Sequence, residues 1–139
     1  MLPLKVLVLG SNGMAGHLIK EYLSNDSKFK LMDIEENLIL SFDIDIIKKI
    51  KKINPDIVIN TLRITVQESE NNPESAILVN SVLPKKLEVF YSNSKVKIIH
   101  LSTDCVFSGE KGSYLENDIP DGKSIYSMTK LCGEIINNK

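Results

Sequence analysis

A tyrosine and a lysine four residues apart are the side chains of this sequence that could carry out acid–base chemistry. Tyr126 and Lys130 form a Tyr-x-x-x-Lys pattern at the start of an expected helix, and this spacing puts both on one helix face. Free tyrosine is a poor proton shuttle at neutral pH, and a neighbouring ammonium favours the phenolate. The pair therefore predicts a general acid for a carbonyl oxygen that receives a hydride. A surface helix with one aromatic and one lysine shows the same pattern.

A run of hydroxyl and carboxyl side chains follows an expected strand. Ser102, Thr103 and Asp104 come at the end of the apolar segment 96–101. Ligands of open α/β sheets bind at the carboxyl ends of strands. A hydroxyl at this place could hydrogen-bond a substrate carbonyl and work with Tyr126, but such a cluster is also typical of a helix cap or a turn.

Three glycines near the other end of the chain predict a phosphate-binding turn. They form a Gly-x-x-Gly-x-x-Gly pattern directly after an expected strand and directly before an expected helix. Glycine allows a tight turn and a close approach to a pyrophosphate, and the helix N-terminus offers free N–H groups. This context favours dinucleotide binding over a plain tight turn. The candidate cofactor contacts of the turn are Gly10, Asn12, Gly13, Met14 and Gly16.

An acid near the end of the second strand usually binds the adenosine ribose of a dinucleotide, about 20 residues further on. Asp33, 17 residues after Gly16, is the candidate, and a surface acid at a strand end is the alternative. Asp43 and Ile44 follow a third apolar run, where an adenine edge could lie. No arginine is near for a 2′-phosphate, which tilts the expected cofactor slightly toward NADH over NADPH.

Short apolar runs alternate with amphipathic stretches along the chain. The expected strands are residues 4–9, 28–33, 38–42, 56–60 and 96–102. The expected helices are residues 17–23, 44–53, 73–92 (with a kink or turn at Pro84) and 125–136, and residues 108–123 read as a loop. This order predicts an α/β fold with a Rossmann-like, doubly wound, mostly parallel sheet.

Length and composition favour one globular domain, residues 1–139, with 42% apolar and 25% charged residues. The net charge of −1 predicts no attraction to nucleic acid or to a membrane surface. Two cysteines without metal-type spacing indicate reduced thiols and no metal site. No apolar run approaches the ~20 residues of a membrane span, and no signal peptide is recognisable. We therefore expect a cytoplasmic protein.

Taken together, these motifs resemble the N-terminal part of an extended short-chain dehydrogenase/reductase. More narrowly, they resemble the dTDP-4-dehydrorhamnose reductase group of sugar-nucleotide reductases. The resemblance is carried by residues 10–16 (GSNGMAG), 55–60 (PDIVIN), Asn80 with Pro84, 102–109 (STDCVFSG) and 126–134 (YSMTKLCGE). It covers nearly the whole chain, and the last two motifs are specific.

The resemblance implies a catalytic triad of Thr103, Tyr126 and Lys130. Tyr126 would protonate the C4 oxygen, Thr103 would orient the keto group, and Lys130 would also hold the nicotinamide ribose. The implied reaction is the reduction, by NADPH or NADH, of the 4-keto group of a dTDP- or UDP-linked 4-keto-6-deoxy sugar. The nucleotide-sugar is the implied substrate, and a homodimer is the implied assembly.

Two departures from the family pattern concern the cofactor side. Family members follow the strand-end asparagine, here Asn60, with small residues that line the cofactor. This chain has Thr61, Leu62 and Arg63 instead. Asn60, Thr61 and Arg63 are therefore candidate cofactor contacts, and Arg63, the single arginine, could touch a phosphate or close part of the groove. Cys105 replaces the usual aromatic residue.

The family pattern continues beyond residue 139 into a substrate domain, so we expect a fold truncated before that domain. Two functions stay open at this point. One is the sugar-nucleotide reductase, of which this chain is an incomplete fragment that could be inactive alone. The other is a non-catalytic nucleotide-binding or regulatory module of the same fold, which would resemble the regulatory subunit of methionine adenosyltransferase.

Overall fold

The computed structural model describes residues 2–32, 34 and 45–136, and these form two compact units. The first unit comprises the chain as far as Leu62 together with Lys86–Leu101. The second comprises Arg63–Lys85 and the chain from Ser102 onward. The single domain expected from the length stays a prediction.

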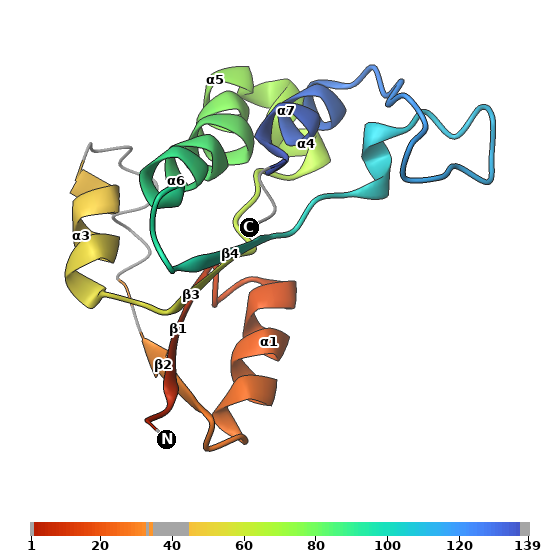
Figure 1. Ribbon diagram of the computed structural model, residues 1–139. Helices are drawn as coiled ribbons and strands as arrows, with labels where there is room; N and C mark the ends of the chain where they lie inside the picture. The colour runs from red at the N-terminus through yellow and green to blue at the C-terminus, as the bar shows by residue number, and fades with distance from the viewer. Residues whose placement is uncertain (1, 33, 35–44, 137–139) are drawn as a thin grey trace. The chain divides into compact units, whose positions relative to one another are not determined.

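The first unit is built on a four-stranded parallel sheet (Figure 1). Its strands are β1 (Leu4–Leu9), β2 (Phe29–Met32), β3 (Ile57–Asn60) and β4 (Lys97–His100), in the order β2-β1-β3-β4. Leu9 pairs with Asn60, and Asn60 pairs with His100, so three strands end level with one another. The predicted α/β class and parallel sheet are confirmed. The expected strand at 38–42 lies outside the described residues.

Two helices lie on opposite sides of this sheet, α1 (Met14–Ser24) and α3 (Asp45–Ile53) (Figure 1). Side chains alternate across a strand, so Val6 and Val8 share one face, where Ile19 and Leu23 of α1 pack against their cluster. In helix α3, Ile50 is completely buried and Ile46 is nearly so. The apolar stripe read from its sequence is therefore the buried face.

The second unit consists of short helices. They are α4 (Val66–Asn71), α5 (Pro73–Ala76), the π-helix η1 (Ile77–Val82), the 3₁₀-helix η2 (Asp104–Val106) and α7 (Ile125–Gly133). Helix α6 (Leu83–Tyr91) follows η1 directly and belongs to the second unit as far as Lys85. The expected helix 73–92 is thus one helical path with a π-helical stretch just before Pro84. Proline lacks the N–H that would continue α-helical bonding, which accounts for the irregularity at that place.

Several helix boundaries differ from those expected. Helix α1 begins at Met14 instead of residue 17, and α7 ends at Gly133 instead of residue 136. Helices α4 and η2 were not predicted. Within the part of the chain that the structure describes, no helix is long and apolar enough to cross a membrane.

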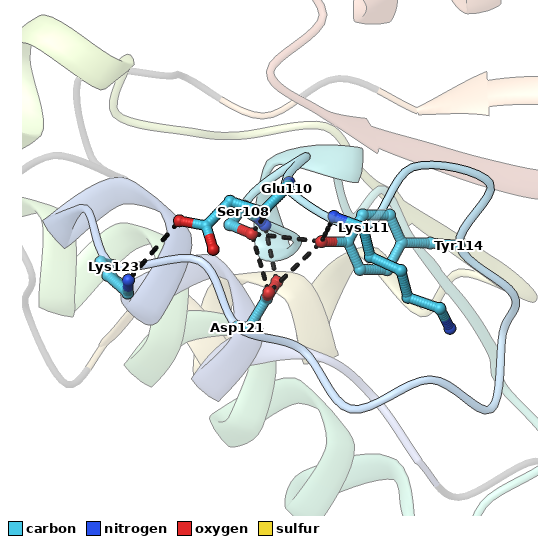
Figure 2. Close-up of polar contacts among 6 residues, drawn as sticks. All are labelled: Ser108, Glu110, Lys111, Tyr114, Asp121 and Lys123. Carbon is cyan, nitrogen blue, oxygen red and sulfur yellow. Dashed lines mark hydrogen bonds and ion pairs between the residues drawn. The ribbon is translucent and has the colours of Figure 1, made fainter.

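The loop ahead of α7 is held by side chains instead of regular secondary structure. Asp121 accepts hydrogen bonds from the Ser108 N–H and hydroxyl, each at 2.7 Å. The Tyr114 hydroxyl lies 3.1 Å from the same serine oxygen (Figure 2). The Tyr114 ring stacks on Phe107 with centroids 4.5 Å apart. An ion pair joins Lys123 to Glu110 across the loop at 3.7 Å. Residues 107–123 are therefore ordered by their own contacts.

Candidate active site

Helix α7 carries both members of the Tyr-x-x-x-Lys pattern, and the structure buries both. Tyr126 is 6% exposed and Lys130 2% exposed. The helix begins with a cap, because the Ser124 hydroxyl accepts the Ser127 N–H at 3.0 Å. A surface helix with an incidental tyrosine and lysine would leave them in solvent, so this alternative does not fit the observed burial.

Side chains from neighbouring segments fix α7 along its length. At its start, a carboxylate oxygen of Glu70 on α4 accepts the Ile125 N–H at 3.0 Å. In its middle, the Asn80 amide donates to the Thr129 hydroxyl at 3.2 Å, and the Ser81 hydroxyl donates to the Thr129 carbonyl at 2.7 Å. These contacts fix the rotation of α7 about its axis and its position along that axis, and therefore the positions of Tyr126 and Lys130.

Asn80 is the centre of this arrangement. Its side chain is fully buried, and its Oδ1 accepts the Ile64 N–H at 2.8 Å while its Nδ2 reaches the Ile64 carbonyl at 3.4 Å. The backbones also meet: a Cβ on Gly133 would overlap the main-chain carbonyl of Asn80. Asn80 therefore joins the segment before α4, the π-helix and α7.

Burial and charge together lower the pKa of Lys130 from 10.5 to about 8. Loss of hydration is the largest cause, and the positive charge of Arg63 acts in the same direction. The negative charge of Glu134 opposes them. The side chain therefore carries a positive charge at neutral pH that its surroundings, on balance, disfavour.

Thr103 lies at the start of η2, which packs against α7. Its hydroxyl accepts the Cys105 N–H at 3.2 Å and lies 3.3 Å from a carboxylate oxygen of Asp104. Thr103 therefore caps η2, in agreement with the helix-cap interpretation of the cluster of Ser102, Thr103 and Asp104. The half-buried hydroxyl keeps one further lone pair, and its proton can turn from Asp104 toward a ligand.

Gly122 connects η2 to the start of α7. Its N–H donates to the Val106 carbonyl at 2.8 Å, and a Cβ at residue 122 would lie 2.8 Å from the Ser127 Cβ. The hydroxyl of Tyr126 has no hydrogen-bond partner among the described residues. Thr103, Tyr126 and Lys130 all belong to the second unit, the first at the start of η2 and the other two on α7, against which η2 packs.

The glycine turn lies in the first unit, and its three glycines have different roles. Gly10 has φ +84°, a conformation that other residues rarely adopt. Gly16 lies in the first turn of α1, where a Cβ would overlap the Gly10 carbonyl. Gly13 is the exposed N-cap of α1 with φ −77° and no side-chain cap. With no acid in the first turn, the helix N-terminus presents N–H groups and a positive dipole end.

The neighbouring candidates of this unit hold the strand ends in place. Asn60 is fully buried, and its Oδ1 accepts the Leu62 N–H at 3.2 Å. Its Nδ2 must then face His100 Nδ1, 3.1 Å away, so that this ring nitrogen accepts the hydrogen bond. The Thr61 hydroxyl donates to the Leu9 carbonyl at 2.8 Å. Both side chains are thus engaged in the first unit, whereas Asn12 and Met14 are exposed.

Four further candidates are placed as follows. Arg63 is exposed and belongs to the second unit. Asp33, Asp43 and Ile44 lie outside the described residues, so their roles stay predictions. No group of three or more histidine, cysteine or acidic side chains that could hold a metal ion occurs in residues 2–32, 34 and 45–136.

Sequence reasoning missed the residues that position α7. Glu70 and Ser81 were not identified, and Asn80 and Glu134 were noted only within motifs, without a role. Thr65 and Glu68 form a capping box at the start of α4, with the Thr65 hydroxyl accepting the Glu68 N–H at 3.4 Å. That Thr-x-x-Glu spacing is a signal that could have revealed α4.

Comparison with known proteins places this geometry in a family. The model of the RmlD substrate binding domain family matches residues 4–138. A probable low-salt glycan biosynthesis reductase of Haloferax volcanii is 32% identical over an alignment of 139 positions that covers 91% of this chain. A dTDP-4-dehydrorhamnose reductase of Shigella flexneri is 27% identical over an alignment of 136 positions that covers 94% of this chain. The chain spans 46% of the length of each, about half of these relatives.

Solved structures agree with the fold. The dTDP-4-dehydrorhamnose reductase of Clostridium acetobutylicum superposes with a TM-score of 0.82 at 28% identity, covering 93% of this chain and 47% of the other. The enzyme of Bacillus anthracis, solved in complex with NADP, gives a TM-score of 0.85 at 24% identity, over 96% of this chain and 48% of the other. The second likeness concerns the fold alone.

Proposed function

This chain belongs to the RmlD substrate binding domain family, and we propose on that basis that it reduces the 4-keto group of a nucleotide-linked 4-keto-6-deoxy sugar. NADPH or NADH is the proposed hydride donor, and a dTDP-sugar the proposed substrate. The observation that carries the proposal is the burial of Tyr126 and Lys130 on one anchored helix, with Thr103 as the N-cap of the 3₁₀-helix that packs against it.

The proposed roles follow from the chemistry of each side chain. A reduced nicotinamide bound at this site would supply a hydride to the carbonyl carbon of the sugar. The Tyr126 hydroxyl donates its proton to the C4 oxygen, on which negative charge develops. The Lys130 ammonium stabilises the phenolate that remains and holds the nicotinamide ribose. The Thr103 hydroxyl orients the keto group by a hydrogen bond.

The glycine turn fits a pyrophosphate by its own geometry. Gly13 ends the turn without a side chain, and the first turn of α1 carries neither a capping side chain nor an acid. Such an N-terminus binds anions through its N–H groups and dipole. Arg63 is a proposed contact for a phosphate, and Asp33, Asp43 and Ile44 keep their proposed places along the adenosine. A homodimer and a cytoplasmic location also stay proposals.

Oxidation of NADPH in the presence of a dTDP-linked 4-keto-6-deoxy sugar tests the function. We expect turnover that falls by about 10²–10⁴-fold in Tyr126→Phe, with cofactor affinity unchanged. Tyr22→Phe, an exposed tyrosine on α1, is the matched control and should turn over like the unchanged chain. Cofactor binding without any oxidation would fit both the non-catalytic module and a reductase fragment that is inactive by itself, whereas turnover would exclude the non-catalytic module.

A further inference from the structure

An acidic side chain lies at the carboxyl end of the helix that carries Tyr126 and Lys130. Glu134 is the C-cap of α7, one turn beyond Lys130. The helix dipole disfavours a negative charge at this end, so the local electrostatics of the helix do not account for the acid. The position of the Glu134 carboxylate must therefore be explained by its contacts with other segments of the chain.

Two contacts hold Glu134 in place. Its carboxylate oxygen Oε1 accepts a hydrogen bond from the Ser102 hydroxyl at 2.5 Å. Its main-chain carbonyl accepts one from Lys85 Nζ, also at 2.5 Å. Ser102 directly follows the segment that leads out of β4, and Lys85 lies in the first turn of α6. Glu134 is thus fixed by two segments distant from it in sequence.

Glu134 and Arg63 act on Lys130 in opposite directions. Arg63 repels the ammonium, whereas Glu134 attracts it. Both belong to the second unit, as Lys130 does. Lys130 is 2% exposed. Charges that are shielded from water interact more strongly than charges in solvent, because the effective dielectric constant around them is lower. The two groups therefore form an opposed pair around a buried cation.

The other titratable groups on the elements around α7 have different partners or surroundings. Helix α7 packs against η1, α4, η2 and α5. The π-helix carries no ionisable side chain. On α4, Glu68 bonds to Thr65 and Glu70 accepts the Ile125 N–H. Glu74, Asp104 and Cys105, on α5 and η2, are exposed.

We propose that Glu134 is a positioning residue whose carboxylate, clamped by Ser102, offsets the repulsion from Arg63 and keeps the Lys130 ammonium charged beside Tyr126. The inference rests on the proposed function in one respect: Tyr126 is taken as the proton donor whose phenolate Lys130 stabilises. The charge balance itself exists without cofactor or substrate. It can therefore be tested on the chain alone.

The test is a pH titration of the 139-residue chain with ¹³C-labelled lysine side chains, followed by NMR. The Lys130 signal is assigned by its disappearance in Lys130→Met. We expect a midpoint of about 8 in the unchanged chain. Glu134→Gln keeps an acceptor for Ser102 but removes the charge, and it should lower the midpoint by about 0.5 unit or more. Arg63→Gln should raise it, and the double variant should fall between the two.

The direction of the shift separates this role from a structural one. A substitution that merely loosens the site admits water and moves the midpoint up, toward 10.5. Ser102→Ala, at an exposed residue, removes the hydrogen bond to the Glu134 carboxylate but keeps its charge. It should lower the Lys130 midpoint by less than Glu134→Gln does. An unchanged or raised midpoint in Glu134→Gln or in Ser102→Ala would overturn the proposal. Failure to bind NADPH would overturn the proposed function and leave this result standing.

Discussion

Gly133 packs directly against the main-chain carbonyl of Asn80, so closely that a Cβ at residue 133 would overlap that oxygen. The contact joins the carboxyl end of α7 to the π-helix. Together with the hydrogen bond between Asn80 and Thr129, it fixes the helix that presents Tyr126 and Lys130.

Gly133→Ala should destabilise the chain by about 1–3 kcal/mol, since backbone must move to admit the methyl group. Urea unfolding measures the change. Gly13→Ala is the matched control: Gly13 has φ −77°, and its Cβ would lie 3.3 Å from the nearest atom. Equal stability losses in the two variants would contradict the close contact at Gly133.

Asn80→Ala should cost about 2–3 kcal/mol of unfolding free energy, because it leaves the Ile64 peptide without its buried partner. Asn93→Ala, at an exposed asparagine, should change stability by less than about 0.5 kcal/mol. Thermal unfolding of both variants gives the comparison. A neutral Asn80→Ala would show that the network does not hold α7.

The described sheet was predictable because β1, β3 and β4 are short runs with β-branched residues, and β1 matches its expected bounds. The contacts that fix α7 were not predictable. Asn80 and Thr129 are 49 residues apart in sequence, and no local pattern records such a pairing. Helix α4 (VQESEN) lacks an apolar stripe, so hydrophobic periodicity could not reveal it. The π-helix of residues 77–82 has the same apolar spacing as an ordinary helix.

The lowered pKa of Lys130 makes stability depend on pH. The unfolded chain binds the proton up to about pH 10.5, whereas the folded chain releases it near pH 8. Stability should therefore rise between pH 8 and 10.5, by up to about 3 kcal/mol. Lys130→Met should lose this rise, and Lys86→Met, at an exposed lysine, should keep it.

The comparison must be made between variants, because burial raises the pKa of Tyr91 above 10. That group retains its proton longer in the folded chain, so it lowers stability as the pH rises above 10. Tyr91 acts equally in all three proteins. Identical pH dependence in Lys130→Met and Lys86→Met would contradict the burial of the Lys130 charge.

Asp121→Asn should loosen the loop of residues 107–123. Hydrogen bonds from the Ser108 N–H and hydroxyl hold the pKa of Asp121 below 3.8, so their contribution is present above pH 3.8 and is lost as the pH falls below it. At pH 7 we expect trypsin to cut after Lys111 several-fold faster in Asp121→Asn. Glu116→Gln, an exposed change in the same loop, should be cut at the original rate. Equal rates in both variants would show that Asp121 does not order the loop.

Calorimetric titration of the chain with NADPH, and then with NADH, tests the central claim most directly. The account predicts micromolar binding of at least one cofactor, weakened at least tenfold in Gly13→Val, because a side chain there blocks approach to the N-terminus of α1. His17→Ala, at an exposed residue of the same helix, should bind like the unchanged chain. Absence of binding to either cofactor, or equal binding by Gly13→Val, would contradict the dinucleotide site on which the proposed reductase depends.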